Sequence, residues 1–193
     1  MFPTTIWTTI EMAGARDPGA LEAFAREYRA PVLAAIEQRG FADGDAEDLC
    51  QDVFLRILSG DVLARADAAK GRFRSLLLAV TMHVVQHRLA KRREIVTDDL
   101  EPLERDPDFD RAWVLHLAER AMRRLRAASS PYFEVLRDHL AGTVQDRNKL
   151  WIARNKLQAL IRDEVARTCS SPGAIEGELE YLRRYLRPNS QNL

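Results

Sequence analysis

The stretch "DAEDLCQDVFLRIL", residues 45–58, decides the fold class of the first half of the chain. Its apolar residues recur three or four positions apart, which predicts a helix with one buried face. The predicted buried residues are Leu49, Cys50, Val53, Phe54, Ile57 and Leu58. The predicted outward residues are Gln51, Asp52, Leu55 and Arg56. Asp45 is a candidate N-cap, and the acids around it match the positive end of the helix dipole.

Similar spacing continues through most of the 193 residues. Amphipathic patterns cover residues 21–40, 75–93, 111–127, 130–142, 146–168 and 172–187. Pro31 predicts a kink or a new helix start, and Gly40 predicts a helix stop. With 46% hydrophobic residues, 30% charged residues, only nine glycines and few β-branched runs, the chain is typical of an all-α globular protein.

One acidic segment divides these helical patterns. Residues 94–110, "EIVTDDLEPLERDPDFD", hold eight acids against Arg105, with two prolines and no apolar period. These features predict a linker. We therefore expect two small helical domains, at 1–93 and 111–193, joined by the linker at 94–110.

Basic residues flank the helix expected at 75–93, although Lys and Arg together equal Asp and Glu at 29 each. The sequences "KGRFR" and "HRLAKRR" lie at its entry and exit. Cations on one side of a domain neutralise phosphates. Phe73, His83 and His87 lie among them and are suited to stacking on unpaired bases. The alternative is an ordinary solvated charge run.

The sequence holds no phosphate-binding glycine loop, nucleophile elbow or C-x-x-C motif, so we expect no catalytic site and no cofactor. His83 and His87 have the i, i+4 spacing of a metal site, but "HVVQH" lacks the glutamate of a metalloprotease. We assign no metal and keep a metal hydrolase only as a check. Cys50 and Cys169 are expected to be reduced thiols. With no signal peptide and no apolar run of about 18 residues, we expect a cytoplasmic protein that makes no membrane contact.

Taken together, "DAEDLCQDVFLRIL" and "KGRFRSLLLAVTMHVVQHRLAKRRE" resemble region 2 of bacterial extracytoplasmic-function (ECF) sigma factors. The opening "FPTTIWTTI" and the ending "LQALIRDEVARTCSSPGAIEGELEYLRRYL" resemble one group of that family, found in large-genome environmental bacteria. The likeness is strongest over residues 40–93 and weaker after 110. It implies an alternative sigma factor, with no enzymatic activity of its own, that binds core RNA polymerase and directs promoter recognition and DNA melting.

The resemblance also implies residue roles in the first half. The helix at 45–58 would dock on the clamp helices of the polymerase β′ subunit, through Asp48, Gln51, Asp52, Leu55 and Arg56. The following helix would open promoter DNA and hold a strand of the −10 element. The residues implied in that role are Lys70, Arg72, Arg74, His83, Gln86, His87, Arg88, Lys91, Arg92 and Arg93.

The second half departs from the family pattern. A region 4-like domain carries a helix-turn-helix for the −35 element and meets the polymerase β flap. Here "DHLAGTVQDRNKLWIARNKL" is about a dozen residues shorter than that motif requires. Residues still able to reach DNA are Arg147, Asn148, Lys149, Trp151, Arg154 and Lys156. A second hypothesis therefore stays open, in which a sigma-derived adaptor docks on polymerase and a partner protein recruits it to DNA. The promoter sequence, the inducing signal and any anti-sigma partner are not encoded in a recognisable motif.

Overall fold

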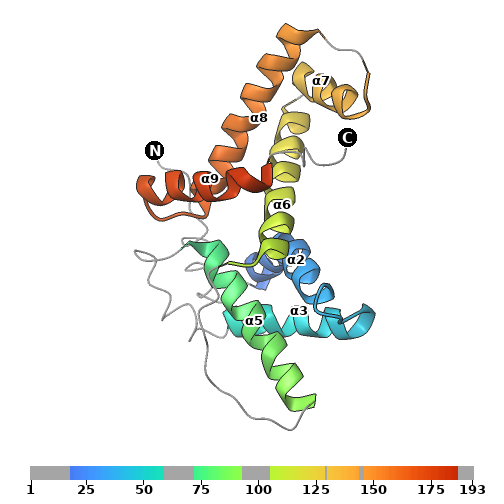
Figure 1. The fold of residues 1–193 in the computed structure, drawn as a ribbon, viewed down its shortest axis with the longest axis vertical. Helices are drawn as coiled ribbons and strands as arrows, with labels where there is room; N and C mark the ends of the chain where they lie inside the picture. Colours follow the sequence, from blue (N-terminus) through green and yellow to red (C-terminus); the bar gives the residue numbers. More distant parts are fainter. Residues whose placement is uncertain (1–17, 59–71, 93–104, 129, 144–145, 187–193) are drawn as a thin grey trace.

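The computed structural model describes residues 18–58, 72–92, 105–128, 130–143 and 146–186. These residues form seven helices and no strand, which confirms the all-α fold (Figure 1). The helices are α2 (Pro18–Glu37), α3 (Asp43–Leu58), α5 (Phe73–Arg92), α6 (Pro107–Ala127), α7 (Pro131–Leu140), α8 (Arg147–Arg167) and α9 (Pro172–Leu186). None of these described helices combines the length and the apolar character needed to cross a membrane.

Helix α6 is the central helix of the molecule and runs along its long axis (Figure 1). Helices α2, α3 and α5 gather at its first half, whereas α7 and the start of α8 lie near its far end. α6 contacts α2, α7, α8 and α9. Helices from both sides of the acidic segment therefore pack on one another.

The sequence predicts a kink or a new helix start at Pro31, and the structure excludes the new start. The chain passes through this proline as one helix from Pro18 to Glu37, so it neither stops nor restarts there. Buried Val32 and Ile36 follow the proline, and their packing offsets the cost of its missing N–H. After the helix, the N–H of Gly40 donates to the carbonyl of Glu37 at 2.9 Å, with a φ of 83° that glycine adopts without strain. The predicted stop at Gly40 is confirmed.

The buried and exposed sides of helix α3 are those that the sequence predicts. Leu49, Val53 and Ile57 are buried, as are Cys50 and Phe54. The helix begins at Asp43, so Asp45 lies in its first turn and is not the N-cap. Asp45 still complements the positive end of the helix dipole from that position.

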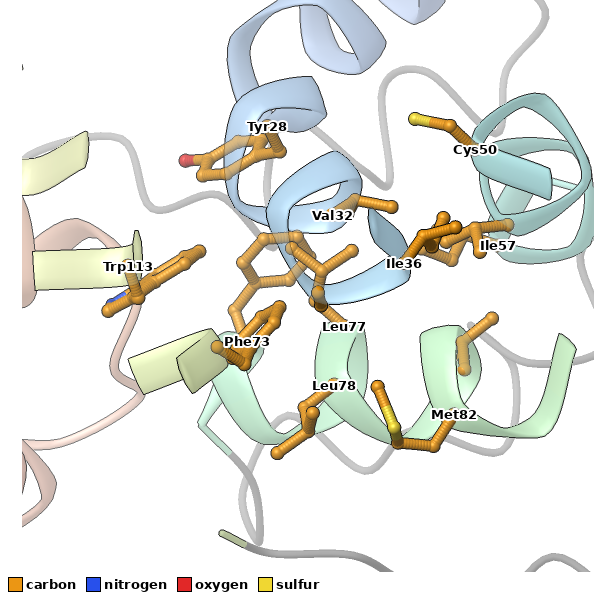
Figure 2. Packing of buried hydrophobic residues seen from close by; sticks show 14 of the residues in the cluster. Tyr28, Val32, Ile36, Cys50, Ile57, Phe73, Leu77, Leu78, Met82 and Trp113 are labelled. Carbon is orange, nitrogen blue, oxygen red and sulfur yellow. The ribbon is translucent and has the colours of Figure 1, made fainter. Parts of the chain in front are cut away.

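One aromatic cluster joins the two halves of the chain (Figure 2). Tyr28 of α2 lies 4.9 Å from Phe73 of α5 and 5.8 Å from Trp113 of α6, measured between ring centroids. Leu182 of α9 and Val165 of α8 belong to the same core. A smaller cluster, of Leu125, Leu136 and Ala153 with partly buried neighbours, holds α6, α7 and α8 together at the far end.

The predicted linker is shorter than expected at its C-terminal end. Residues 107–110 form the first turn of α6, and Phe109 is buried there. Asp106 is the N-cap, because its carboxylate accepts a 2.8 Å hydrogen bond from the N–H of Phe109. Residues 94–104 lie outside the described part of the chain. The shared core crosses the expected boundary, and the division into two domains stays a prediction.

Both cysteines are buried and neither forms a disulfide. Burial raises the pKa of the Cys50 thiol and of the Cys169 thiol to about 11. Both side chains therefore stay protonated at neutral pH.

Candidate functional site

The outward face of α3 presents the five residues predicted for polymerase binding. Asp48, Gln51, Asp52, Leu55 and Arg56 are all exposed. Leu55 is 66% exposed and is the apolar member of this set. The structure brings the five residues together as one face, here called the α3 face, with an apolar centre between charged neighbours.

The C-terminal end of α5 lies directly beside the α3 face. Arg88 approaches Asp52 at 3.7 Å and Asp45 at 3.8 Å, so it links the two helices. Gln86, His87 and Lys91 are exposed there as predicted. The group of Gln86, His87, Arg88 and Lys91 is called the α5 cationic end below. Arg92 is in α5 but its side chain lies outside the described residues, as do Lys70 and Arg93 entirely.

The prediction that Arg74, at the start of α5, contacts DNA is wrong. Arg74 is 2% exposed and donates to Glu178 at 2.5 Å and to Asp110 at 2.6 Å. Arg72 is half-buried and lies 3.1 Å from Glu178. Burial acts to lower the pKa of Arg74, but the hydrogen bond and charge of Glu178 outweigh it, and the pKa is raised. Arg74 is therefore a charged core residue, and its position does not present it to DNA.

His83 also differs from the prediction. Its side chain is buried, and not on the surface where a base would stack. Its ring centroid lies 6.4 Å from that of exposed His87. Within the described residues, no group of three or more His, Cys, Asp or Glu side chains is placed to hold a metal ion.

The first half of α8 carries the third predicted set on an exposed surface. Arg147, Asn148, Lys149, Trp151, Arg154 and Lys156 are all exposed. Trp151 is 66% exposed and Leu140, at the end of α7, is 80% exposed. Asp146 caps the helix by accepting hydrogen bonds from the N–H groups of Asn148 and Lys149, at 2.8 and 3.3 Å. The six predicted residues of α8, all exposed, are called the α8 face.

Some α8-face residues also pack on α7. A guanidinium nitrogen of Arg154 lies 2.9 Å from Nε2 of His139, and Nζ of Lys156 lies 5.2 Å from the Tyr132 ring centroid. These contacts orient two of the cations along the helix pair. α7 and α8 pack against each other, with residues 141–146 between them.

The sequence interpretation missed the buried acids that bind the arginines. Glu164 of α8 accepts from Arg120 at 2.7 Å and from Arg124 at 2.9 Å. Glu178 and Asp110 hold Arg74 in the same manner. The sequence does contain a signal for Glu178 and Glu164. Each acid lies on the apolar stripe of its helix, one helical turn from a buried leucine or isoleucine.

Searches of protein-family models, curated proteins and solved structures find no match to this chain. The functional interpretation therefore depends on the three exposed faces and on their chemistry. The α3 face and the α5 cationic end adjoin, whereas the α8 face belongs to the far end of α6.

Proposed function

We propose that the protein is an alternative sigma factor of the ECF kind, which binds core RNA polymerase and directs promoter recognition and DNA melting. The observation that supports this most is the juxtaposition of two faces. The α3 face, with exposed Leu55, lies next to the α5 cationic end through Arg88 and Asp52. A protein that binds polymerase with one face and promoter DNA with the next needs this arrangement.

The α3 face has the chemistry of a protein-binding site. An apolar side chain at the centre of a patch supplies binding free energy when water is excluded, and the charges around it select the partner. Leu55 fills the central role, with Asp48, Asp52 and Arg56 around it. The proposed partner is the β′ clamp coiled coil, whose basic residues Asp48 and Asp52 would meet.

The α5 cationic end has the chemistry of a strand-binding site. Arg88 and Lys91 would neutralise phosphates, and His87 would stack on an unpaired base. Opening the duplex costs a few kcal/mol for each unstacked base, and contacts to the captured strand offset that cost. The protein carries out no reaction in this scheme, because polymerase performs the chemistry.

The α8 face would contact the −35 element in the same scheme. Arg147 and Lys149 lie in the first turn of α8, where their exposed cationic side chains would neutralise phosphates. Arg154 lies about two turns further along and is exposed for base edges or backbone. The second half of the chain would also meet the polymerase β flap.

A second candidate function is a sigma-derived adaptor that a partner protein recruits to DNA. The exposed apolar residues Leu140 and Trp151 favour it, because large apolar side chains at a surface are typical of protein interfaces. An anti-sigma protein would be another occupant of the same surface.

In vitro transcription with bacterial core polymerase and a genomic promoter library tests the proposal. Specific initiation with this protein alone supports a sigma factor. Polymerase binding without promoter choice supports the adaptor. Failure to bind core polymerase at low ionic strength overturns both.

A salt titration of promoter binding tests the α5 cationic end. Lys91→Ala removes one exposed cation and should lower the slope of log affinity against log salt by about one unit. Arg183→Ala, an exposed change on α9, is the matched control and should leave the slope unchanged. Equal slopes for Lys91→Ala and wild type would count against DNA contact by the α5 cationic end.

A further inference from the structure

A cavity of about 730 Å³ lies between α2, α6 and α8, away from the three faces described above. Its lining is rich in arginine, with contributions from all three helices. The arginines are Arg26, Arg120, Arg123, Arg124 and Arg167. Three glutamates, Glu27, Glu119 and Glu164, share the lining, so five positive charges face three negative ones.

The inner wall of the cavity is an internally satisfied ion-pair network. Glu164 is buried and accepts from Arg120 and Arg124, and Arg120 also pairs with Glu27. This network holds the three helices together. It accounts for the inner arginines without a ligand.

The remaining arginines of the lining form weaker ion pairs or none. Arg123 lies 3.9 Å from Glu119, the outer limit of an ion pair, and is 64% exposed. Arg26 pairs with Glu22, and both side chains are largely exposed. Arg167 is half-buried and forms no ion pair with any residue that the structure describes, although its charge lowers the pKa of Glu164. Such exposed pairs contribute little to stability, so these guanidinium groups are available to a stronger partner.

Two ionisable groups of the lining have lowered pKa values, chiefly because they are removed from water. Burial lowers the pKa of His116 to about 4; the charge of Arg123 acts in the same direction and that of Glu164 opposes it. Burial likewise lowers the pKa of Arg120, and the charges of Arg167 and Arg123 lower it further, although Glu164 opposes them. His116 is only 5% exposed, and its Nε2 has no hydrogen-bond partner among the described residues. The cavity thus contains a buried polar atom without a partner beside an excess of cations.

We propose that this cavity binds a phosphorylated small molecule carrying at least two negative charges. Planar guanidinium groups bind phosphate oxygens with paired hydrogen bonds, which suits Arg123 and Arg167 at the rim. Glu22 and Asp163 pair with Arg26 and Arg124 from outside the lining, so the attraction for a phosphate comes from Arg123 and Arg167. The volume is within the range of metabolite-binding pockets and leaves room for an organic part beside the phosphate.

Occupancy of the cavity would strengthen the packing of the two halves of the chain. Its walls come from α2, before the acidic segment, and from α6 and α8, after it. A ligand that binds only this folded arrangement stabilises it by mass action. The inference is independent of the proposed function, because it concerns the isolated protein.

Isothermal titration calorimetry with inorganic pyrophosphate and with ADP, at about 0.15 M ionic strength to screen loose ion pairing, tests the proposal. Both probes should bind at one site, ADP more tightly, and adenosine should not bind. Arg167→Gln and Arg123→Gln should each weaken ADP binding at least tenfold. Bound ADP should also raise the midpoint of thermal unfolding.

Arg111→Gln is the matched control. Arg111 lies on the same helix as Arg123, is 63% exposed and has one long ion pair, of 3.5 Å with Asp108, but it does not line the cavity. This variant should bind ADP as the wild type does. Absence of saturable binding of either probe, or equal weakening by Arg111→Gln, would overturn the proposal. Arg123 is exposed enough that its variant tests binding even if Arg167→Gln fails to fold.

Discussion

Nε of Arg74 donates a 2.5 Å hydrogen bond to Oε1 of Glu178, across 104 positions of the sequence and inside the core. The other side of the guanidinium lies 2.6 Å from Asp110, which also accepts from the hydroxyl of Tyr181. The guanidinium carbon lies 4.7 Å from the centroid of the Tyr181 ring. One arginine of α5 is therefore bound by residues of α6 and α9, and this network holds the start of α5 in place.

Replacing Glu178 by Gln should destabilise the protein by about 3 kcal/mol, because it leaves the Arg74 charge buried with less compensation. Urea unfolding monitored by circular dichroism measures the change. Glu180→Gln is the control, since Glu180 lies on the same helix but is exposed and, among the described residues, pairs with Arg183. The control should change stability by less than about 0.5 kcal/mol. Equal effects of the two variants would contradict a special role for the buried pair.

His116 should make stability depend on pH below neutrality. Its pKa is about 4 in the folded protein and 6.5 in an ordinary setting, so the unfolded chain binds the proton more tightly. Its contribution is fully present above pH 6.5 and is lost as the pH falls towards 4. At pH 5 the wild type should have lost about 2 kcal/mol relative to pH 7.5 through this group.

Urea unfolding of His116→Gln at both pH values isolates that contribution, because the variant should lose about 2 kcal/mol less than the wild type. His87→Gln replaces an exposed histidine and should follow the wild-type pH profile. A His116→Gln profile parallel to that of the wild type would argue against a neutral buried imidazole.

Asp146→Ala should cost about 1 kcal/mol, because it removes the side chain that accepts from two N–H groups at the start of α8. Asp163→Ala changes an exposed acid inside the same helix and should cost less. Chemical denaturation compares the two variants. The α8 face depends on this cap for its orientation, so Asp146→Ala should also weaken DNA binding if that face contacts DNA.

Neither cysteine should react with iodoacetamide in the native protein at pH 8. Cys50 and Cys169 are buried, and their raised pKa leaves almost no thiolate. Mass spectrometry should show both thiols alkylated in urea and neither without it. Rapid labelling of one cysteine under native conditions would place that residue in a segment that opens locally.

Asp48→Lys should weaken binding to core RNA polymerase at least tenfold without loss of fold, since Asp48 is exposed on the α3 face. Glu180→Lys makes the same change of charge on α9 and is the control. Pull-down of core polymerase measures binding, and circular dichroism verifies the fold. Loss of folded structure in Asp48→Lys would mean that the side chain stabilises α3 and that the test must move to Leu55.

Much of the first half was predictable because its helices have clear apolar periods. The division of α3 into buried Val53 and exposed Leu55 follows from spacing alone. In α5 the spacing of apolar residues did not show which histidine is buried. His83 is buried and His87 is exposed. His83 is polar, but it lies on the inward side of a helix that is apolar through most of its length.

The sequence by itself determined the helices, the stop at Gly40 and which side of α3 faces outward, because these features depend on contacts within a few residues. Only the tertiary structure decided that Arg74 is buried and that arginines of α2, α6 and α8 surround one cavity. The physical reason is that burying a charged side chain costs free energy of desolvation, which only a nearby opposite charge offsets. The partners of Arg74, Asp110 and Glu178, lie 36 and 104 positions away, beyond the reach of any local pattern.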